Sequence, residues 1–229
     1  MLAGVQRRAL EAVLTEKTGT LFAPAERIPQ EPIQTGIPAA DLLLGGIPRG
    51  CITEISGVAS SGRTSFVTAF LAQVTRNEEF AAYIDVTDSF DPGTMQAAGV
   101  DLDHLLWIRC GGKLEHALRA TDLVLHGGGF GITVFDLADI APEWVRRIPM
   151  SYWFRFRRAV ENKPHGCVLL DPVPCAGTCA ALALETRQGE AVWRGDPRFL
   201  LLKIARFKLC RRKPGADRPV SLDRCLSPI

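Results

Sequence analysis

Three features are missing from this chain of 229 residues. No apolar run is long enough to span a bilayer, and no segment has the charged and apolar pattern of a signal peptide. The formal net charge is only +2, so overall charge does not indicate a nucleic-acid partner. We therefore expect a cytoplasmic protein without a membrane partner, and any basic cluster has to be judged locally.

The number and spacing of the cysteines predict neither disulfide bonds nor a zinc site. Their number, 7, is odd and their spacing is irregular, which disfavours a disulfide framework and favours a reducing compartment. Cys175 and Cys179 lie close together in "PCAGTC", but no second pair of ligands follows at the spacing of a zinc site. We expect free thiols.

The apolar content suffices for one sizeable core, since 47% of the residues are hydrophobic. From residue 51 onward, strand patterns alternate with helix patterns, which predicts an α/β fold with a doubly wound, mostly parallel sheet. Stretches 180–187, 190–195 and 199–210 predict antiparallel strands at the C-terminal end. Residues 1–34 predict a helix and a proline-rich extended arm, and residues 35–229 the core domain.

The segment "GVASSGRT" follows a predicted strand and opens a predicted helix, which is the context of a phosphate-binding loop. Glycines let successive backbone N–H groups face a phosphate, and the helix adds its positive N-terminal end. Thr64 would ligate Mg²⁺ together with Asp136, which ends the apolar strand "ITVFD". ATP with Mg²⁺ is the expected ligand. The candidate nucleotide-binding residues are Gly57, Ala59, Ser60, Ser61, Gly62, Arg63, Thr64, Ser65 and Asp91.

Several segments together resemble the core of the RecA family of recombinases. They are "IQTGIPAADLLLGGIPRGCITEISG", "YIDVTDSFDPGTMQAAGVDLDHLL", "EHALRATDLVLHGGGFGITVFDL", "SYWFRFRRAV" and "CVLLDP". The resemblance covers about residues 5–213 and implies a RecA-like P-loop NTPase core. It leaves no room for the family's separate C-terminal DNA-gathering domain.

Departures from the family pattern fall on the residues that serve catalysis. Thr87 stands where the resemblance places the glutamate that orients the attacking water, and Pro172 stands where it places the glutamine that senses the γ-phosphate. Arg63 replaces the loop lysine, and Thr94 replaces an adenine-stacking tyrosine. Losing a general base typically removes about 10²–10⁴ in rate. The resemblance therefore implies a pseudo-ATPase, unless Asp85 or Asp88 acts as the base.

Two further features of the resemblance concern assembly. Arg206 and Lys208 in "KIARFK" match cations that reach a neighbouring subunit's γ-phosphate in the family, although they are equally well explained as solvated charges on a strand. Phe22 and Ala25 are spaced as in the Phe-x-x-Ala plug that recombinase subunits use to bind each other. RecA-type subunits, or a second copy of this chain, are the implied partners.

A basic and aromatic segment matches the family's first DNA-binding loop and the helix after it. Cations mixed with aromatic rings suit weak binding of single-stranded DNA, because phosphates are neutralised and bases stack. The alternative is that the aromatic residues at helical spacing form core. The candidate DNA-binding cations are Arg146, Arg147, Arg155, Arg157 and Arg158, and the aromatic residues are Trp144, Tyr152, Trp153, Phe154 and Phe156.

Length and eroded motifs are similar to those of ImuA-type proteins, RecA-like accessory proteins of bacterial DNA repair that act beside a polymerase-like partner in damage-induced translesion mutagenesis. That resemblance implies an accessory function with a degenerate nucleotide site. Two alternatives remain open: an active DNA-dependent ATPase or recombinase, and a structural adaptor that binds no nucleotide.

Overall fold

The computed structural model describes residues 30–196, 199–213 and 220–225. The predicted helix and the Phe22 and Ala25 pair lie outside these residues, and so does most of the arm. The strands are β1 (Ile52–Ser56), β2 (Ala81–Asp85), β3 (Leu105–Arg109), β4 (Ile132–Asp136), β5 (Gly166–Asp171), β6 (Ala180–Asp196), β7 (Phe199–Lys213) and β8 (Val220–Cys225). The α-helices are α2 (Pro38–Leu44), α3 (Arg63–Arg76), α4 (Pro92–Ala97), α5 (Leu114–Gly127), α6 (Pro142–Val145) and α7 (Met150–Val160), and the 3₁₀ turns are η1 (Leu102–His104) and η2 (Gly177–Cys179).

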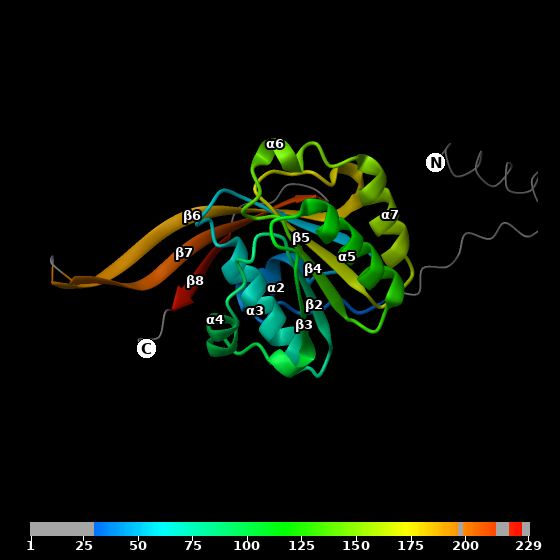
Figure 1. The fold of residues 1–229 in the computed structure, drawn as a ribbon. Coiled ribbons are helices and arrows are strands. Elements are labelled where there is room, and N and C mark those ends of the chain that lie inside the picture. Colours follow the sequence, from blue (N-terminus) through cyan, green and yellow to red (C-terminus); the bar gives the residue numbers. More distant parts are fainter. Residues whose placement is uncertain (1–29, 197–198, 214–219, 226–229) are drawn as a thin grey trace, which may run out of the picture.

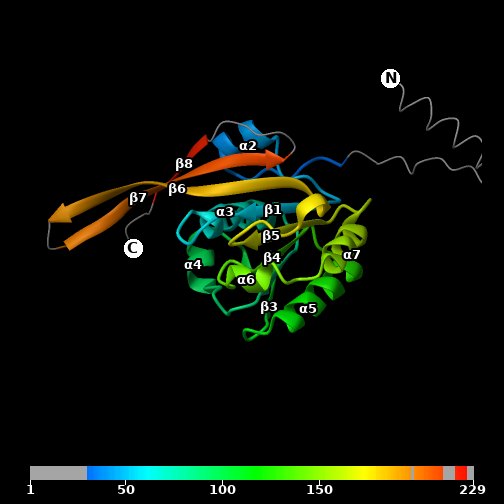
Figure 2. The same cartoon turned by 90° about the horizontal axis from the view of Figure 1, so that it is seen from above.

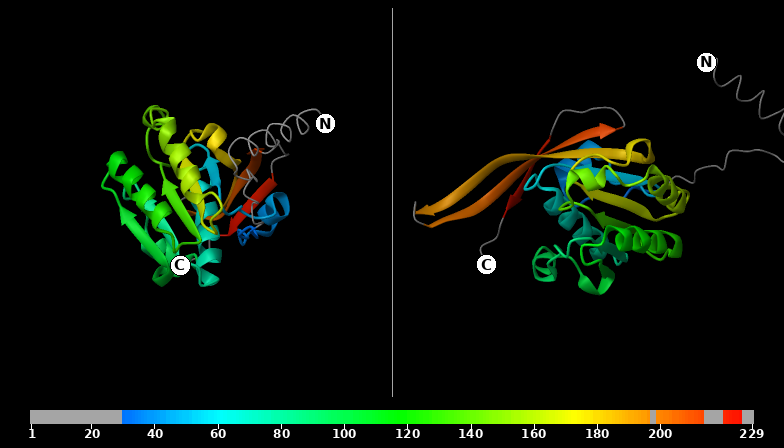
Figure 3. Two further views of the ribbon diagram at one scale, coloured as in Figure 1. Left: turned by 90° about the vertical axis from the view of Figure 1, so that its right-hand side faces the viewer. Right: turned by 45° about the horizontal axis from the view of Figure 1, so that its top comes forward.

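The described strands form one sheet in the order β3-β2-β4-β5-β1-β6-β7-β8. Strands β3 to β6 of that order pair in parallel, whereas β7 is antiparallel to β6 and β8 is antiparallel to β7. Helices cover both faces of the parallel part (Figure 1 and Figure 3). The predicted fold class is confirmed, because the sheet is doubly wound and its antiparallel strands lie at the C-terminal end.

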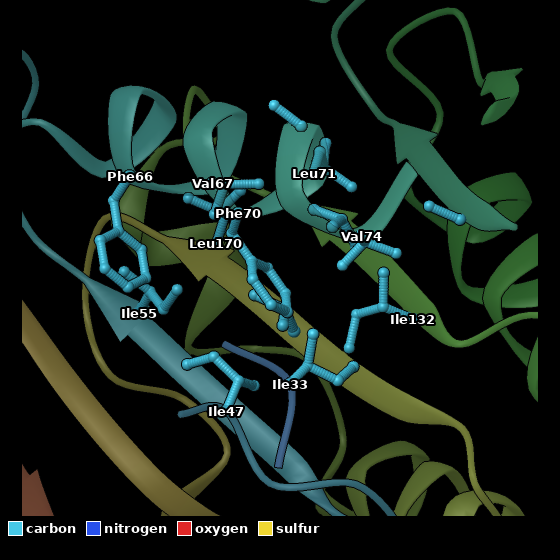
Figure 4. Close-up of a cluster of buried hydrophobic side chains, with 14 of the residues drawn as sticks. Ile33, Ile47, Ile55, Phe66, Val67, Phe70, Leu71, Val74, Ile132 and Leu170 are labelled. Atoms are coloured by element: carbon cyan, nitrogen blue, oxygen red, sulfur yellow. The ribbon is translucent and has the colours of Figure 1, made fainter. Parts of the chain in front are cut away.

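The two faces of the sheet bury separate apolar clusters. On one face, α3 inserts Phe66, Phe70 and Val74 over residues of β1, β4 and β5 (Figure 4). On the other face, α5 and α7 pack over the sheet, with Trp153 and Phe156 fully buried. The central strands are buried on both faces, which explains why they read as continuous apolar runs rather than as alternating patterns.

Residues near the predicted domain boundary also enter the core. Ile33 pairs with Ile47 through an isolated β-bridge, and both side chains pack under α3. None of the described helices is both long and apolar enough to cross a membrane.

The C-terminal strands differ from the sequence expectation. Stretches 180–187 and 190–195, predicted as two strands, form the single strand β6, which carries a register shift between Gln188 and Ala191 instead of a turn. Strand β6 pairs with β1 only through Ala180–Glu185, and its remainder pairs only with β7 within the described residues. A two-stranded ribbon therefore extends away from the helical layers (Figure 2). Strand β8 was not predicted.

A buried histidine joins β4 to the residue that precedes β5. The Nε2 atom of His165 lies 2.6 Å from the Thr133 hydroxyl, and His165 is almost wholly buried. Burial lowers the pKa of His165 to about 4, and the nearby charge of Lys163 adds to the decrease. An unfolded histidine has a pKa near 6.5, so as the pH falls His165 is protonated in the unfolded chain before it is protonated in the folded protein.

We expect the free energy of unfolding to fall as pH decreases from about 6.5 to about 4, with His165 contributing up to about 3 kcal/mol of that loss. Urea denaturation across this pH range, on wild type and His165→Gln, measures the contribution. The matched control is His116→Gln, at an exposed position on α5. An unchanged pH slope in His165→Gln would contradict the assignment.

Candidate functional site

The predicted phosphate loop connects β1 to α3 and borders a cavity of about 320 Å³. Gly62 stands at the N-cap of α3 with φ +95°, a conformation that favours glycine. The hydroxyl of Ser61 lies 2.8 Å from that of Thr186 on β6, which ties the loop to the neighbouring strand. The predicted nucleotide-binding residues that line this cavity are Ala59, Ser60, Ser61, Gly62, Arg63, Thr64 and Ser65.

An aromatic ring from β7 lies on the loop. Phe207 is almost fully buried and lines the same cavity. A Cβ atom added at Gly62 would stand 2.4 Å from Cγ of Phe207, so the ring packs directly against the loop backbone. Phe207 therefore occupies space at the wall of the phosphate cavity.

Arg63 turns into the protein interior. Its side chain is almost fully buried, and its Nη2 atom donates to the carbonyl of Ala138 at 3.2 Å. Burial lowers the pKa of Arg63, while the negative charges of Asp136, Asp171 and Asp139 act against that decrease. One guanidinium nitrogen is thus held by the backbone near protein carboxylates, while the buried Nη1 atom has no hydrogen-bond partner among the described residues.

Both carboxylate oxygens of Asp136 are engaged within the protein. The Tyr83 hydroxyl, on β2, donates to one oxygen at 2.5 Å, and the backbone N–H of Ala138 donates to the other at 2.8 Å. Burial raises the pKa of Asp136 to about 6, and these two hydrogen bonds oppose the increase. Burial, followed by the charge of Asp136, raises the pKa of Tyr83 well above its ordinary value, so Tyr83 acts as a neutral donor.

The two residues predicted to hold Mg²⁺ differ in their surroundings. Thr64 is exposed at the start of α3, whereas each carboxylate oxygen of Asp136 already accepts one hydrogen bond, from Tyr83 or from Ala138. Asp91 lies apart from the loop cavity's lining residues and caps α4, accepting hydrogen bonds from the backbone of Gly93 and Thr94.

The residue at the predicted position of the catalytic base and the two acids that could replace it lie in different surroundings. Thr87 is exposed just beyond β2. Asp85 is fully buried and accepts hydrogen bonds from the backbone N–H groups of Ser89 and Phe90 and from the indole of Trp107. Asp88 forms an ion pair with Arg109 at 3.0 Å. Each of the two carboxylates thus already has a partner within the protein.

The remaining predicted residues lie directly after β5 and on β7. Pro172 follows β5 directly and is half-buried. Lys208 is exposed on β7, whereas the side chain of Arg206 lies outside the part that the structure describes. The structure therefore brings Arg63, Asp136 and the loop together, and it keeps Lys208 on the outer side of the same strand that carries Phe207.

The predicted DNA-binding segment divides into an exposed part and a core part. The guanidinium of Arg147 lies 5.1 Å from the ring centroid of Trp144, which is 59% exposed. Trp153, which we expected to be available for base stacking, is fully buried because it faces the sheet from α7. Phe156 is core for the same reason, so the helical spacing of these aromatics reflects packing.

Not all predicted cations are equally free. Arg155 forms an ion pair with Asp122 of α5 at 2.5 Å. Arg157 lines a cavity of about 400 Å³ at the C-terminal end of α7. Arg146, Arg147 and Arg158 are exposed. The strongest candidate surface for a single strand is therefore the pair Arg146 and Arg147 beside Trp144.

Sequence reasoning missed Tyr83 and Phe207. Tyr83 stands in an ordinary apolar strand, and only the parallel pairing of β2 with β4 reveals that its hydroxyl meets Asp136. Phe207 is distant in sequence from the loop that it covers. The position of Phe207, an apolar residue between the cations Arg206 and Lys208, was the one feature of the sequence that could have indicated its burial.

We predict that Gly62→Ala destabilises the fold through Phe207. Overpacking typically costs about 1–3 kcal/mol, in addition to the strain of a left-handed residue. The control is Gly45→Ala, because Gly45 has φ +72° and no atom stands within 4 Å of the place that its new methyl group would take. In a Phe207→Ala background, the cost of Gly62→Ala should fall but stay above that of the control, because the Cβ atom of residue 207, which alanine keeps, stands 2.8 Å from the place of the new methyl group. Equal costs in both backgrounds, measured by denaturant unfolding, would refute the contact.

Comparison with known proteins places these features in a family. Residues 23–144, more than half of the chain, match the RecA N-terminal domain. The chain is 38% identical over 120 residues to Protein RecA of Symbiobacterium thermophilum, which covers 51% of this chain and 34% of that protein. It is 33% identical over 150 residues to Protein RecA of Caulobacter sp. strain K31, which covers 61% of this chain and 42% of that protein.

The chain therefore spans between about a third and two fifths of the length of these relatives. The matched segment contains the phosphate loop, Tyr83 and Asp136, whereas Pro172, Phe207 and Lys208 lie beyond it. This chain belongs to the family of the RecA N-terminal domain.

Proposed function

We propose that this protein is a RecA-like accessory protein of bacterial DNA repair in which the nucleotide site has lost catalysis. The observation that carries the proposal is the engagement of Asp136 by Tyr83 and Ala138, beside an Arg63 that is folded inward. A phosphoryl-transfer site needs a cation aimed at the phosphates and a carboxylate available to the metal shell. Here both groups are used inside the protein.

The loss of a base supports the same conclusion. Thr87 carries a hydroxyl that cannot accept a proton at neutral pH, and Asp85 and Asp88 are held by other partners. An active recombinase, the alternative, would have to release one of these acids and also withdraw Tyr83 from Asp136. Phosphate binding by the loop backbone needs neither change, because the N–H groups remain in a strand–loop–helix context.

The proposed partners rest on family membership and on the similarity to ImuA-type proteins. Subunits of RecA type, or a second copy of this chain, would pack against the N-terminal arm with Phe22 and Ala25 and against the strand that carries Arg206 and Lys208. A polymerase-like partner in damage-induced translesion mutagenesis would account for an accessory protein without turnover. Single-stranded DNA would bind weakly, through phosphates, at Arg146 and Arg147.

We predict an ATP turnover far below about 1 s⁻¹, the lower end of the ordinary enzyme range. Replacing Arg63→Lys together with Thr87→Glu should raise turnover, because it restores a phosphate cation and a base. Adding Tyr83→Phe should raise it further, because Asp136 then loses the hydroxyl that occupies it. Phosphate release with and without single-stranded DNA measures all three proteins, and calorimetry measures nucleotide binding separately.

A wild-type turnover of about 1 s⁻¹ or more would overturn the proposal and favour the active ATPase. No nucleotide binding by any of the three proteins would favour the structural adaptor. Glu115→Gln, at an exposed position on α5, is a control that should leave turnover unchanged.

DNA binding should depend on salt and hardly on sequence. Each neutralised phosphate of a single strand contributes about 0.7 to the slope of log affinity against log salt. The double change Arg146→Ala/Arg147→Ala should therefore lower that slope by about 1.4. Binding should also respond little to ATP, because Pro172 has no amide side chain that could carry a γ-phosphate signal.

Fluorescence anisotropy with labelled single-stranded DNA over a salt series provides the measurement. The matched control is Arg76→Ala/Arg119→Ala, which removes two exposed arginines from α3 and α5. If the control lowers the slope as much as the test variant does, the surface beside Trp144 is not the binding site. Strong dependence on ATP would instead support the active recombinase.

A further inference from the structure

Three side chains with metal-binding atoms meet on the α7 side of the sheet, where the chain leaves β5. Glu54 comes from β1, Asp171 ends β5, and Cys175 lies in the segment that follows. Each offers one ligand atom, and the three atoms all lie within 4.8 Å of one another. Glu54 and Asp171 are buried, and Cys175 is half-buried.

The segment after β5 is folded back onto β1 by Glu54. One carboxylate oxygen of Glu54 accepts hydrogen bonds from the backbone N–H groups of Cys175 at 2.7 Å and of Ala176 at 2.6 Å. The Cys175 thiol contacts Oδ2 of Asp171 at 3.6 Å. The backbone therefore holds the thiol against the two carboxyl groups.

One atom of this cluster has no protein partner. The Oδ1 atom of Asp171 is buried and accepts no hydrogen bond from any residue that the structure describes. A buried carboxylate oxygen without a donor costs free energy, and a second carboxyl group nearby increases the cost. Arg63 is the cation whose charge acts on Asp171, but its Nη2 atom donates to the carbonyl of Ala138 instead.

We propose that Glu54, Asp171 and Cys175 form a binding site for a divalent zinc ion. A metal would supply the partner that Oδ1 of Asp171 lacks and would offset the two neighbouring carboxyl charges. The proposal is independent of nucleotide binding, since it uses none of the residues that line the phosphate cavity.

The donor set favours zinc over magnesium or calcium. A thiolate is a soft ligand that suits zinc, whereas magnesium and calcium prefer oxygen alone. Zinc binds sulfur at about 2.3 Å and carboxylate oxygen at about 2.0–2.2 Å, so ligand atoms a few ångströms apart need only a small contraction around the ion. A water molecule would fill the fourth position, on the half-buried side of Cys175.

Zinc would fix the segment between β5 and β6, since Asp171 and Cys175 bracket its first residues. Pro172 lies between these two ligands, and Cys179 in η2 lies beyond them. The sequence does not reveal this site, because Glu54 is distant from "PCAGTC" and the three residues do not have the spacing of a zinc motif.

The test is a zinc titration of the full chain in competition with a chromophoric chelator. Wild type should bind one zinc ion that Cys175→Ser and Asp171→Asn each bind at least about tenfold more weakly. Cys179→Ser is the matched control and should bind zinc as wild type does, because Cys179 is outside the cluster. With cobalt in place of zinc, the thiolate-to-metal charge-transfer absorption should be present in wild type and Cys179→Ser and absent in Cys175→Ser.

Circular dichroism of each variant without metal verifies folding, and Asp171→Asn preserves size and hydrogen-bonding capacity. The proposal is overturned if wild type binds no more zinc than Cys175→Ser does, or if Asp171→Asn binds zinc with wild-type affinity. Either result would mean that the cluster is held by shared protons and by Arg63.

Discussion

Negative charge buried in and at the ends of the central strands is the constraint on which the rest of this structure depends. Glu54, Asp136 and Asp171 lie on β1, β4 and β5, three strands that are neighbours in the sheet. Each carboxylate needs donors, since an unpaired buried charge is strongly destabilising. Asp136 receives a hydrogen bond from the Tyr83 hydroxyl, and Glu54 receives hydrogen bonds from the segment that follows β5. The inward position of Arg63 adds a positive charge near these carboxylates.

This use of polar groups connects stability with the proposed loss of activity. In an active phosphate site, the cation and the metal-binding carboxylate are left unpaired until the ligand binds. Leaving them unpaired lowers the folding stability of the ligand-free protein. Here Tyr83 and Phe207 fill the space and the hydrogen-bonding capacity that a ligand would otherwise use. A degenerate site of this kind can be more stable than an active one, because the carboxylate of Asp136 already has donors without substrate.

Much of the fold could be predicted from the sequence, because local patterns determine it. The loop from Gly57 to Thr64, the strand ending at Asp136 and the alternation of the parallel strands with the longer helices follow from short stretches of chain, whereas β8 and the continuity of β6 do not. The site could be predicted only in part, since contacts such as Tyr83 with Asp136 depend on which strands pair. Trp153 shows the same limit, because helical spacing cannot distinguish a buried aromatic face from a stacking surface.

The ribbon of β6 and β7 has a mechanical consequence. Beyond Glu185, β6 is supported only by β7 within the described residues, and the register shift after Gln188 marks a point where such a pair bends easily. Phe207 lies on β7 close to this point and touches Gly62. Bending the part of the ribbon that lies beyond this point would therefore move Phe207 relative to Gly62 and the phosphate loop.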